Sequence, residues 1–195
     1  MDDIVKQAMA KWPNVPHCYG WLALDARGNW RMRDEAAQRA GAPGDKLSNP
    51  ALVGFINRNY GHDDKGRWYF QNGPQRVYVN LEATPYIART DPALGFVLQT
   101  GQALAAPEGV FMTDAGALIL QAGEVVAQLD DRDVAQVLAG VELNGKPASV
   151  EAIMAWLDDD AEELVLVTES GRVKVERLSA EALQRRFDYV QQPGA

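Results

Sequence analysis

The chain has 195 residues, of which 47% are hydrophobic and 24% charged, proportions typical of a folded globular protein. Its single cysteine, Cys18, and its two histidines, His17 and His62, exclude an internal disulfide and a cysteine-rich zinc site. No apolar run reaches the about 20 residues of a membrane span, and Met1-Asp-Asp-Ile carries acids where a signal peptide carries basic residues. We therefore expect a cytoplasmic protein with no membrane association.

The net charge of −8 is unevenly distributed along the chain. Residues 1–100 carry 12 basic and 10 acidic side chains, whereas residues 101–195 carry 7 and 17. We predict two lobes, an aromatic-rich N-terminal lobe over 1–100 and an acidic C-terminal lobe over 101–195, joined near the small-residue-rich segment 101–109. Because the acidic second half would repel nucleic acid at long range, we do not expect nucleic-acid binding.

Hydrophobic spacing predicts the elements of the first lobe in chain order. The expected elements are a helix over 2–12, a hairpin over 18–32, a helix capped by Asn49 that runs to about residue 60, and two strands within 66–87 joined at Asn72-Gly73-Pro74. The pattern Asp-x-x-Gly-x-Trp occurs at 25–30 and again at 63–68. It predicts two similar hairpins of one sheet, because Asp bonds its own backbone in such turns and Gly accepts a positive φ.

The second half continues the alternation of strands and helices. The expected elements are strands over 85–88 and 95–99, a hairpin over 110–120, a strand near 124–127, helices capped by Asp130, Ser149 and Ser179, and a hairpin over 164–176. This order predicts an α+β protein of two small lobes, each of antiparallel β-hairpins with packed helices.

The two strands within 66–87 have faces of different chemistry. One face is apolar and is predicted to be core; it carries Trp68, Phe70, Val77, Val79 and Leu81. The other face carries Arg67, Tyr69, Arg76 and Tyr78, and arginine beside tyrosine can grip a carboxylate or phosphate and stack on a ring. These four residues are the candidate ligand-binding residues, although the pattern favours a face that is covered by the helix at 50–60 with the arginines at its rim.

Other candidate chemistry in the sequence is weaker. His62, Asp63 and Asp64 can be read as a proton carrier with a divalent-cation site, whereas the glycines at 61 and 66 favour a solvated turn. The acidic run at 158–160 lacks the register of a calcium loop and indicates a solvated loop. Glycine-rich phosphate loops and a Gly-x-Ser-x-Gly motif are absent from the sequence. We therefore expect no metal and no cofactor, and favour a protein that is not an enzyme.

Residues 20–90 resemble a group of uncharacterised proteobacterial proteins of similar size, which form domain-of-unknown-function families. The resemblance is carried by Gly-x-Trp, the helix start Asn49-Pro50, Asp64-Lys-Gly-Arg-Trp-Tyr and Gly73-Pro-Gln-Arg-Val-Tyr-Val-Asn-Leu-Glu-Ala-Thr-Pro-Tyr. It implies a bacterial α+β protein and includes no catalytic signature. The sequence thus favours a non-enzymatic binding protein that recognises a protein partner or a small anionic ligand. The alternative is an enzyme that uses His62 with Asp63 or Asp64, with or without a divalent cation.

Overall fold

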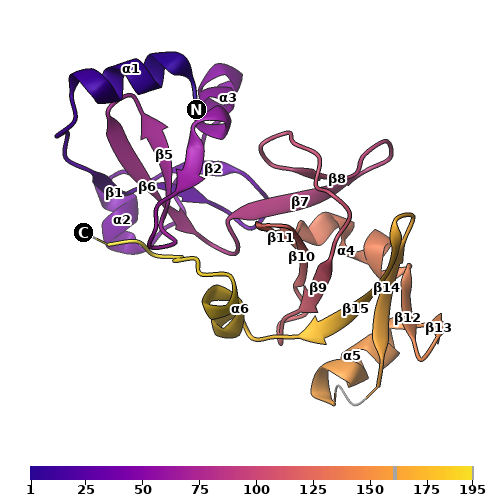
Figure 1. Ribbon diagram of the computed structural model, residues 1–195. Coiled ribbons are helices and arrows are strands. Elements are labelled where there is room, and N and C mark those ends of the chain that lie inside the picture. The colour runs from indigo at the N-terminus through magenta and orange to yellow at the C-terminus, as the bar shows by residue number, and fades with distance from the viewer. Residues whose placement is uncertain (160–161, 195) are drawn as a thin grey trace. The chain divides into compact units, whose positions relative to one another are not determined.

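The computed structural model describes residues 1–159 and 162–194 and divides the chain into two compact units (Figure 1). Unit 1 comprises residues 1–85 and 188–195, and unit 2 comprises residues 86–187. Each unit contains one β-sheet with helices packed on it. The chain is therefore an α+β protein with two sheet-containing lobes, as the sequence predicts. Among the described residues, no helix is both long and apolar enough to cross a membrane.

Unit 1 is built around one mixed sheet. Its elements are α1 (Asp3–Lys11), β1 (Cys18–Leu24), β2 (Trp30–Met32), α2 (Glu35–Ala40), β3 (Asp45–Lys46), α3 (Pro50–Arg58), β4 (Tyr60–His62), β5 (Trp68–Asn72) and β6 (Gln75–Leu81). The strands are ordered β3-β2-β1-β6-β5-β4. The central strands β1 and β6 run parallel and the other neighbours run antiparallel.

The two turns with the shared Asp-x-x-Gly pattern have the same structure. Asp25 Oδ1 accepts hydrogen bonds from the N–H groups two and four residues later, at 3.0 and 2.8 Å. Asp63 Oδ1 accepts from the equivalent groups at 3.0 and 3.1 Å. Gly28 and Gly66 take the positive φ that each turn requires. Because these turns join β1 to β2 and β4 to β5 of one sheet, the predicted pair of similar hairpins is confirmed.

Helix α3 covers the apolar face of this sheet. It begins where predicted, because the Asn49 side chain accepts hydrogen bonds from the N–H groups of Ala51 and Leu52. Its Phe55 ring meets the Phe70 ring edge to face at a centroid distance of 5.4 Å, and Ile56 is buried. The helix therefore packs on the core face and does not lie across the arginine–tyrosine face.

Unit 2 is also built around one mixed sheet. Its elements are β7 (Tyr86–Asp91), β8 (Gly95–Leu98), β9 (Gly109–Met112), β10 (Leu118–Ala122), β11 (Val125–Leu129), α4 (Asp131–Leu138), β12 (Val141–Leu143), β13 (Lys146–Pro147), α5 (Val150–Asp158), β14 (Leu164–Thr168), β15 (Gly171–Arg177) and α6 (Ala180–Arg186). The strands are ordered β13-β12-β14-β15-β9-β10-β11-β7-β8.

Alternation along the strands gives this second sheet two buried faces. Leu118 and Leu120 belong to a large core cluster that includes residues of α4 and α5. Ile119, between them, points to the opposite face and packs with Phe111 and with Leu183 of α6. The caps predicted for these helices are present, since the side chains of Asp130, Ser149 and Ser179 each accept a hydrogen bond from a first-turn N–H.

The units separate between residues 85 and 86, and not between the predicted 100 and 101. Strand β7 pairs with β11, and β8 pairs with β7, so both belong to the second sheet. Residues 188–195 return to unit 1, where the Leu81 N–H donates to the Gln191 carbonyl at 2.8 Å and the Val190 N–H to the Gly66 carbonyl at 2.9 Å.

The two sheets share one connection order. In unit 2, the strands β11-β10-β9-β15-β14-β12 repeat the order β3-β2-β1-β6-β5-β4 of unit 1. In chain order, the first and last strands of each set are β1 and β6 in unit 1 and β9 and β15 in unit 2. In each sheet these two strands are neighbours at the centre of the set and run parallel. A helix joins the third strand to the fourth in both sets, α3 in unit 1 and α4 in unit 2. Unit 2 adds β7 and β8 before this set and β13 and α5 within it.

Candidate functional site

The four predicted ligand-binding residues lie together on one face of the unit 1 sheet. Tyr69 is opposite Tyr78 in the β5–β6 register, and their rings are 5.8 Å apart in an edge-to-face arrangement. The guanidinium carbon of Arg76 lies 4.5 Å from the centre of the Tyr69 ring. The guanidinium carbon of Arg67 lies 4.7 Å from the centre of the Tyr78 ring. Two cation–π pairs thus sit side by side on neighbouring strands.

Asp63, which the sequence does not place in this cluster, holds Arg67. Arg67 Nε and Nη2 lie 2.9 and 2.8 Å from Asp63 Oδ2, and the Tyr78 hydroxyl donates to the same oxygen at 3.0 Å. Burial alone would raise the pKa of Asp63, but the hydrogen bonds from Arg67 and Tyr78 lower it to about 2. The carboxylate is therefore ionised at neutral pH and compensates the charge of Arg67.

The tyrosine rings of the cluster are covered by neighbouring side chains. Tyr19 stacks on Tyr78 with centroids 4.7 Å apart and planes 3° apart, and the His17 ring meets Tyr78 edge-on at 5.7 Å. Tyr78 is consequently 0% exposed and Tyr69 is 8% exposed. A ligand on this face would meet the arginines and not the faces of the tyrosine rings.

Arg76 differs from Arg67 in making no ion pair with a carboxylate of the described residues. Its side chain is half-buried, and among the described residues no carboxylate lies within ion-pair distance of its guanidinium. Burial would lower the pKa of Arg76, but the hydrogen bond with the Tyr78 hydroxyl and electrostatic attraction to Tyr69, Tyr78 and the Asp63 carboxylate raise the pKa above its ordinary value. Arg76 therefore presents a charged guanidinium without an ion-pair partner at the edge of the cluster.

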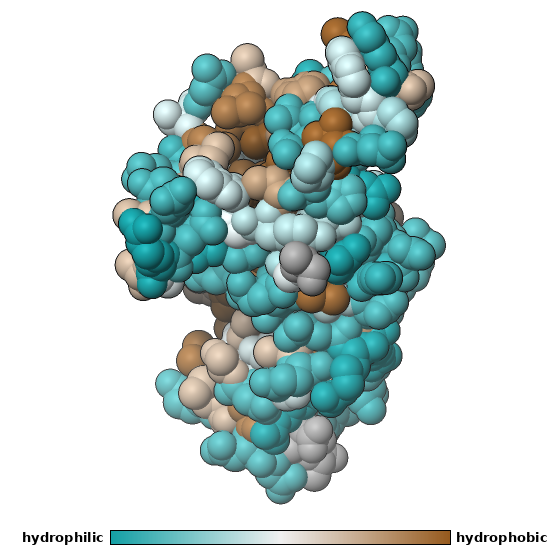
Figure 2. Space-filling view, turned by 90° about the vertical axis from the view of Figure 1, so that its left-hand side faces the viewer, coloured by the Kyte–Doolittle hydropathy of each residue, from teal (hydrophilic) through white to brown (hydrophobic). Residues whose placement is uncertain are grey.

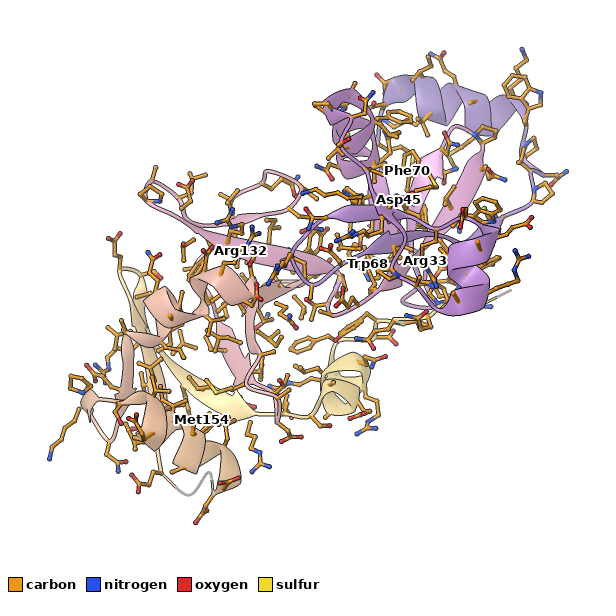
Figure 3. The ribbon with its side chains drawn as sticks, turned by 180° about the vertical axis from the view of Figure 1, so that it is seen from behind. Arg33, Asp45, Trp68, Phe70, Arg132 and Met154 are labelled. Atoms are coloured by element: carbon orange, nitrogen blue, oxygen red, sulfur yellow. The ribbon has the colours of Figure 1, made fainter. Side chains whose placement is uncertain are left out.

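The alternative centred on His62 is not assembled as a dyad. His62 Nδ1 lies 3.0 Å from the backbone carbonyl of Asp63, and the imidazole packs at 4.8 Å on the Trp68 ring (Trp68 is labelled in Figure 3). The Asp63 carboxylate is committed to Arg67 and Tyr78. Within residues 1–159 and 162–194, no group of three or more His, Cys, Asp or Glu side chains is arranged to hold a metal ion. Of the acidic run at 158–160, Asp160 lies outside the described residues.

The opposite, apolar face carries a cavity of about 270 Å³ between the sheet and α3. It is lined by Cys18, Trp21, Leu22, Met32, Leu47, Leu52, Ile56, Phe70, Asn72 and Val77. Trp21, Met32 and Leu52 are exposed although they are large and hydrophobic. Figure 2 shows apolar residues gathered around a hollow in the upper part of the view, where unit 1 lies. Burial at this cavity raises the pKa of the Cys18 thiol, so the thiol is protonated at neutral pH.

These observations define a two-unit α+β protein with an arginine–tyrosine cluster on the sheet of unit 1. The family model DUF2944, whose description reads "Protein of unknown function (DUF2946)", matches residues 1–194, and the chain belongs to this family. This confirms the resemblance to a domain-of-unknown-function family. No curated protein matches the sequence.

One solved structure of similar fold is the crystal structure of a DUF1285 family protein from Silicibacter pomeroyi DSS-3. The two chains are 14% identical, the alignment covers 88% of this chain and 87% of that one, and the TM-score is 0.50. At this identity the likeness shows the fold alone.

Proposed function

We propose that the chain is a cytoplasmic binding protein whose unit 1 recognises a small anionic ligand, with Arg76 as the anion contact beside Arg67, Tyr69 and Tyr78. The supporting observation is the half-buried guanidinium of Arg76, which is held on the Tyr69 ring without a carboxylate partner among the described residues. A guanidinium offers planar paired N–H donors that match a carboxylate or phosphate. Partial burial strengthens such a contact, because less water screens it.

The distribution of charge supports placing the ligand on unit 1. Unit 1 carries 11 basic and 10 acidic side chains, whereas unit 2 carries 8 and 17. An anion is repelled at long range by unit 2 and is not repelled by unit 1.

The two arginines have different roles in this proposal. Arg76 binds the anion, and Tyr69 fixes the position of its guanidinium. Arg67 is a positioning residue, because it forms an ion pair with Asp63 and its Nη2 donates to the Tyr78 hydroxyl at 3.2 Å. We place recognition of a protein partner second, since the apolar cavity offers a place for it but nothing indicates what would fill that cavity.

Thermal unfolding with added anions tests the proposal. We expect phosphate or citrate to raise the Tm of the wild-type protein above its value in sodium chloride of equal ionic strength. Arg76→Ala should abolish this rise and should lower the Tm without ligand less than Arg67→Ala does, because it removes a cation–π contact but no ion pair. Arg67→Ala should lower the Tm without ligand, because it leaves Asp63 without its ion-pair partner.

The matched control is Arg39→Ala on α2, an exposed arginine outside the cluster, which should change neither quantity. The proposal is wrong if neither anion raises the Tm, or if Arg76→Ala keeps the full response.

A further inference from the structure

A second cavity of unit 1, of about 540 Å³, does not include the arginine–tyrosine cluster in its lining. It is bounded by β1, β2 and β6, by the loop after α2 and by Gln192 of the C-terminal segment. Its volume lies within the roughly 300 to 1,000 Å³ of small-molecule sites.

Two arginines line this cavity, and only one of them is paired. Arg31 Nε and Nη2 each lie 2.8 Å from Asp25 Oδ2. Arg33, labelled in Figure 3, donates through Nε to the Ala42 carbonyl at 3.0 Å. No carboxylate of the described residues lies within ion-pair distance of Arg33, and its two terminal nitrogens have no hydrogen-bond partner there. The cavity therefore has one uncompensated positive charge.

The exposed carboxylate of Glu82, which has no ion-pair partner among the described residues, lines the same cavity. Glu82 Oε2 accepts a hydrogen bond from the Ala26 N–H at 3.0 Å, and no cation in the described part of the chain pairs with this carboxylate. Arg33 and Glu82 do not pair with each other. Arg33 and Glu82 thus line one cavity without forming an ion pair with each other. Their opposite charges are complementary to a ligand that carries both a negative and a positive group.

The rest of the lining specifies the body of such a ligand. The half-buried amide of Asn80 has no side-chain partner among the described residues, so it can donate to one ligand group and accept from another. Ala23 and Pro43 add apolar surface.

We infer that this cavity binds a small zwitterion with an apolar body, namely an α-amino acid with an aliphatic side chain. Arg33, aided by Asn80, takes the carboxylate, and Glu82 takes the ammonium group. The inference does not depend on the anion contact at Arg76, because Arg76 does not line this cavity.

Calorimetric titration of the full chain with three matched compounds tests the inference. L-Leucine has both charges, N-acetyl-L-leucine lacks the ammonium group, and isopentylamine lacks the carboxylate. We expect leucine to bind, and each of the other two to bind at least about tenfold more weakly, because each loses one charge-assisted contact.

Two substitutions test which side chain of the cavity contacts each charged group of leucine. Glu82→Gln keeps an acceptor for the Ala26 N–H and removes the charge, so it should abolish the preference for leucine over N-acetyl-leucine. Arg33→Gln should abolish the preference for leucine over isopentylamine. If Arg33→Gln fails to fold because the contact with Ala42 is lost, the Glu82 variant still decides.

Arg76→Ala is the control that separates this site from the proposed anion site, and it should leave leucine binding unchanged. The inference is overturned if leucine does not bind at millimolar concentration. It is equally overturned if N-acetyl-leucine binds as well as leucine, which would indicate an anion site only, or if Glu82→Gln retains the wild-type preference.

Discussion

The two carboxylate oxygens of Asp63 connect the β4–β5 turn to the arginine–tyrosine cluster. Its Oδ1 closes the turn between β4 and β5, and its Oδ2 holds Arg67 and Tyr78. We expect Asp63→Asn to lower the free energy of unfolding by roughly 1 to 3 kcal/mol, because it leaves the half-buried Arg67 without its counter-charge. Urea unfolding at pH 7 measures this difference.

The pKa of Asp63 sets the pH range in which this contribution disappears. In the folded chain the pKa of the Asp63 carboxyl is lowered from its ordinary 3.8 to about 2. Between pH 2 and pH 3.8 the unfolded chain therefore binds more protons at this carboxyl than the folded chain does. The contribution is complete above about pH 4 and is lost as the pH falls towards 2. The stability difference between wild type and Asp63→Asn should therefore shrink over that interval. A constant difference down to pH 2 would contradict this account.

At the residue scale, the sequence predicts one part of the site and misses another. Alternation along a strand predicts one shared face for four residues, and the structure places them there: Arg67, Tyr69, Arg76 and Tyr78. The burial of Tyr78 was not foreseen, because its cover comes from residues 17–19, which precede β6 by about 60 positions. No local pattern specifies that contact.

At the element scale, the β4–β5 turn depends on Gly66. Its φ is +68°, and a Cβ built there would lie 2.0 Å from the backbone carbonyl oxygen of Asp188. We expect Gly66→Ala to destabilise the chain by clearly more than the roughly 1 to 2 kcal/mol of a positive φ alone, since the obstacle is backbone. Urea unfolding of purified variants measures the loss.

Gly41→Ala is the matched control for this substitution. Gly41 has a similar φ of +64°, but a Cβ there would meet nothing within 4 Å. Gly41→Ala should therefore lose only the stability that a positive φ costs an alanine, without a steric clash of the added Cβ. Equal losses at the two positions would show that the approach of Asp188 contributes nothing.

The hairpins and helix caps were predictable from sequence, whereas the parallel pairings were not. Turn residues such as Asp25 and cap residues such as Asn49 act within a few positions, so their effect can be read locally. The parallel pairs join residues as distant as Cys18 and Val77, or Val110 and Val175. Such pairings depend on how whole elements connect, and short-range patterns carry no signal for them.

At the scale of the whole molecule, unit 1 depends on the segment 188–195. Backbone hydrogen bonds join Gln191 to Leu81 and Val190 to Gly66, and the Gln191 side chain donates to the Ala83 carbonyl at 2.7 Å. We expect a chain that ends at residue 187 to have a destabilised unit 1 and an unchanged unit 2, because each lost hydrogen bond contributes about 1 kcal/mol.

Fluorescence and hydrogen exchange distinguish the two units in this truncated chain. Trp12, Trp21, Trp30 and Trp68 lie in unit 1, and Trp156 lies in unit 2. The tryptophan signal should therefore report mainly on unit 1 and show an earlier thermal transition, whereas amides of unit 2 stay protected. Loss of protection in both units to the same extent would show that the lobes do not fold independently.

The return of residues 188–195 to unit 1 also fixes an order of events during synthesis. The ribosome makes residues 1–85, with all six strands of the first sheet, before it makes unit 2, but the segment 188–195 that hydrogen-bonds to this sheet is translated only after all of unit 2. Unit 2 is thus an insertion whose residues are all available before the unit that begins the chain can be finished. While about 100 further residues are added, the nascent protein carries the first sheet, with its apolar cavity, without the backbone hydrogen bonds that Val190 and Gln191 later make to Gly66 and Leu81.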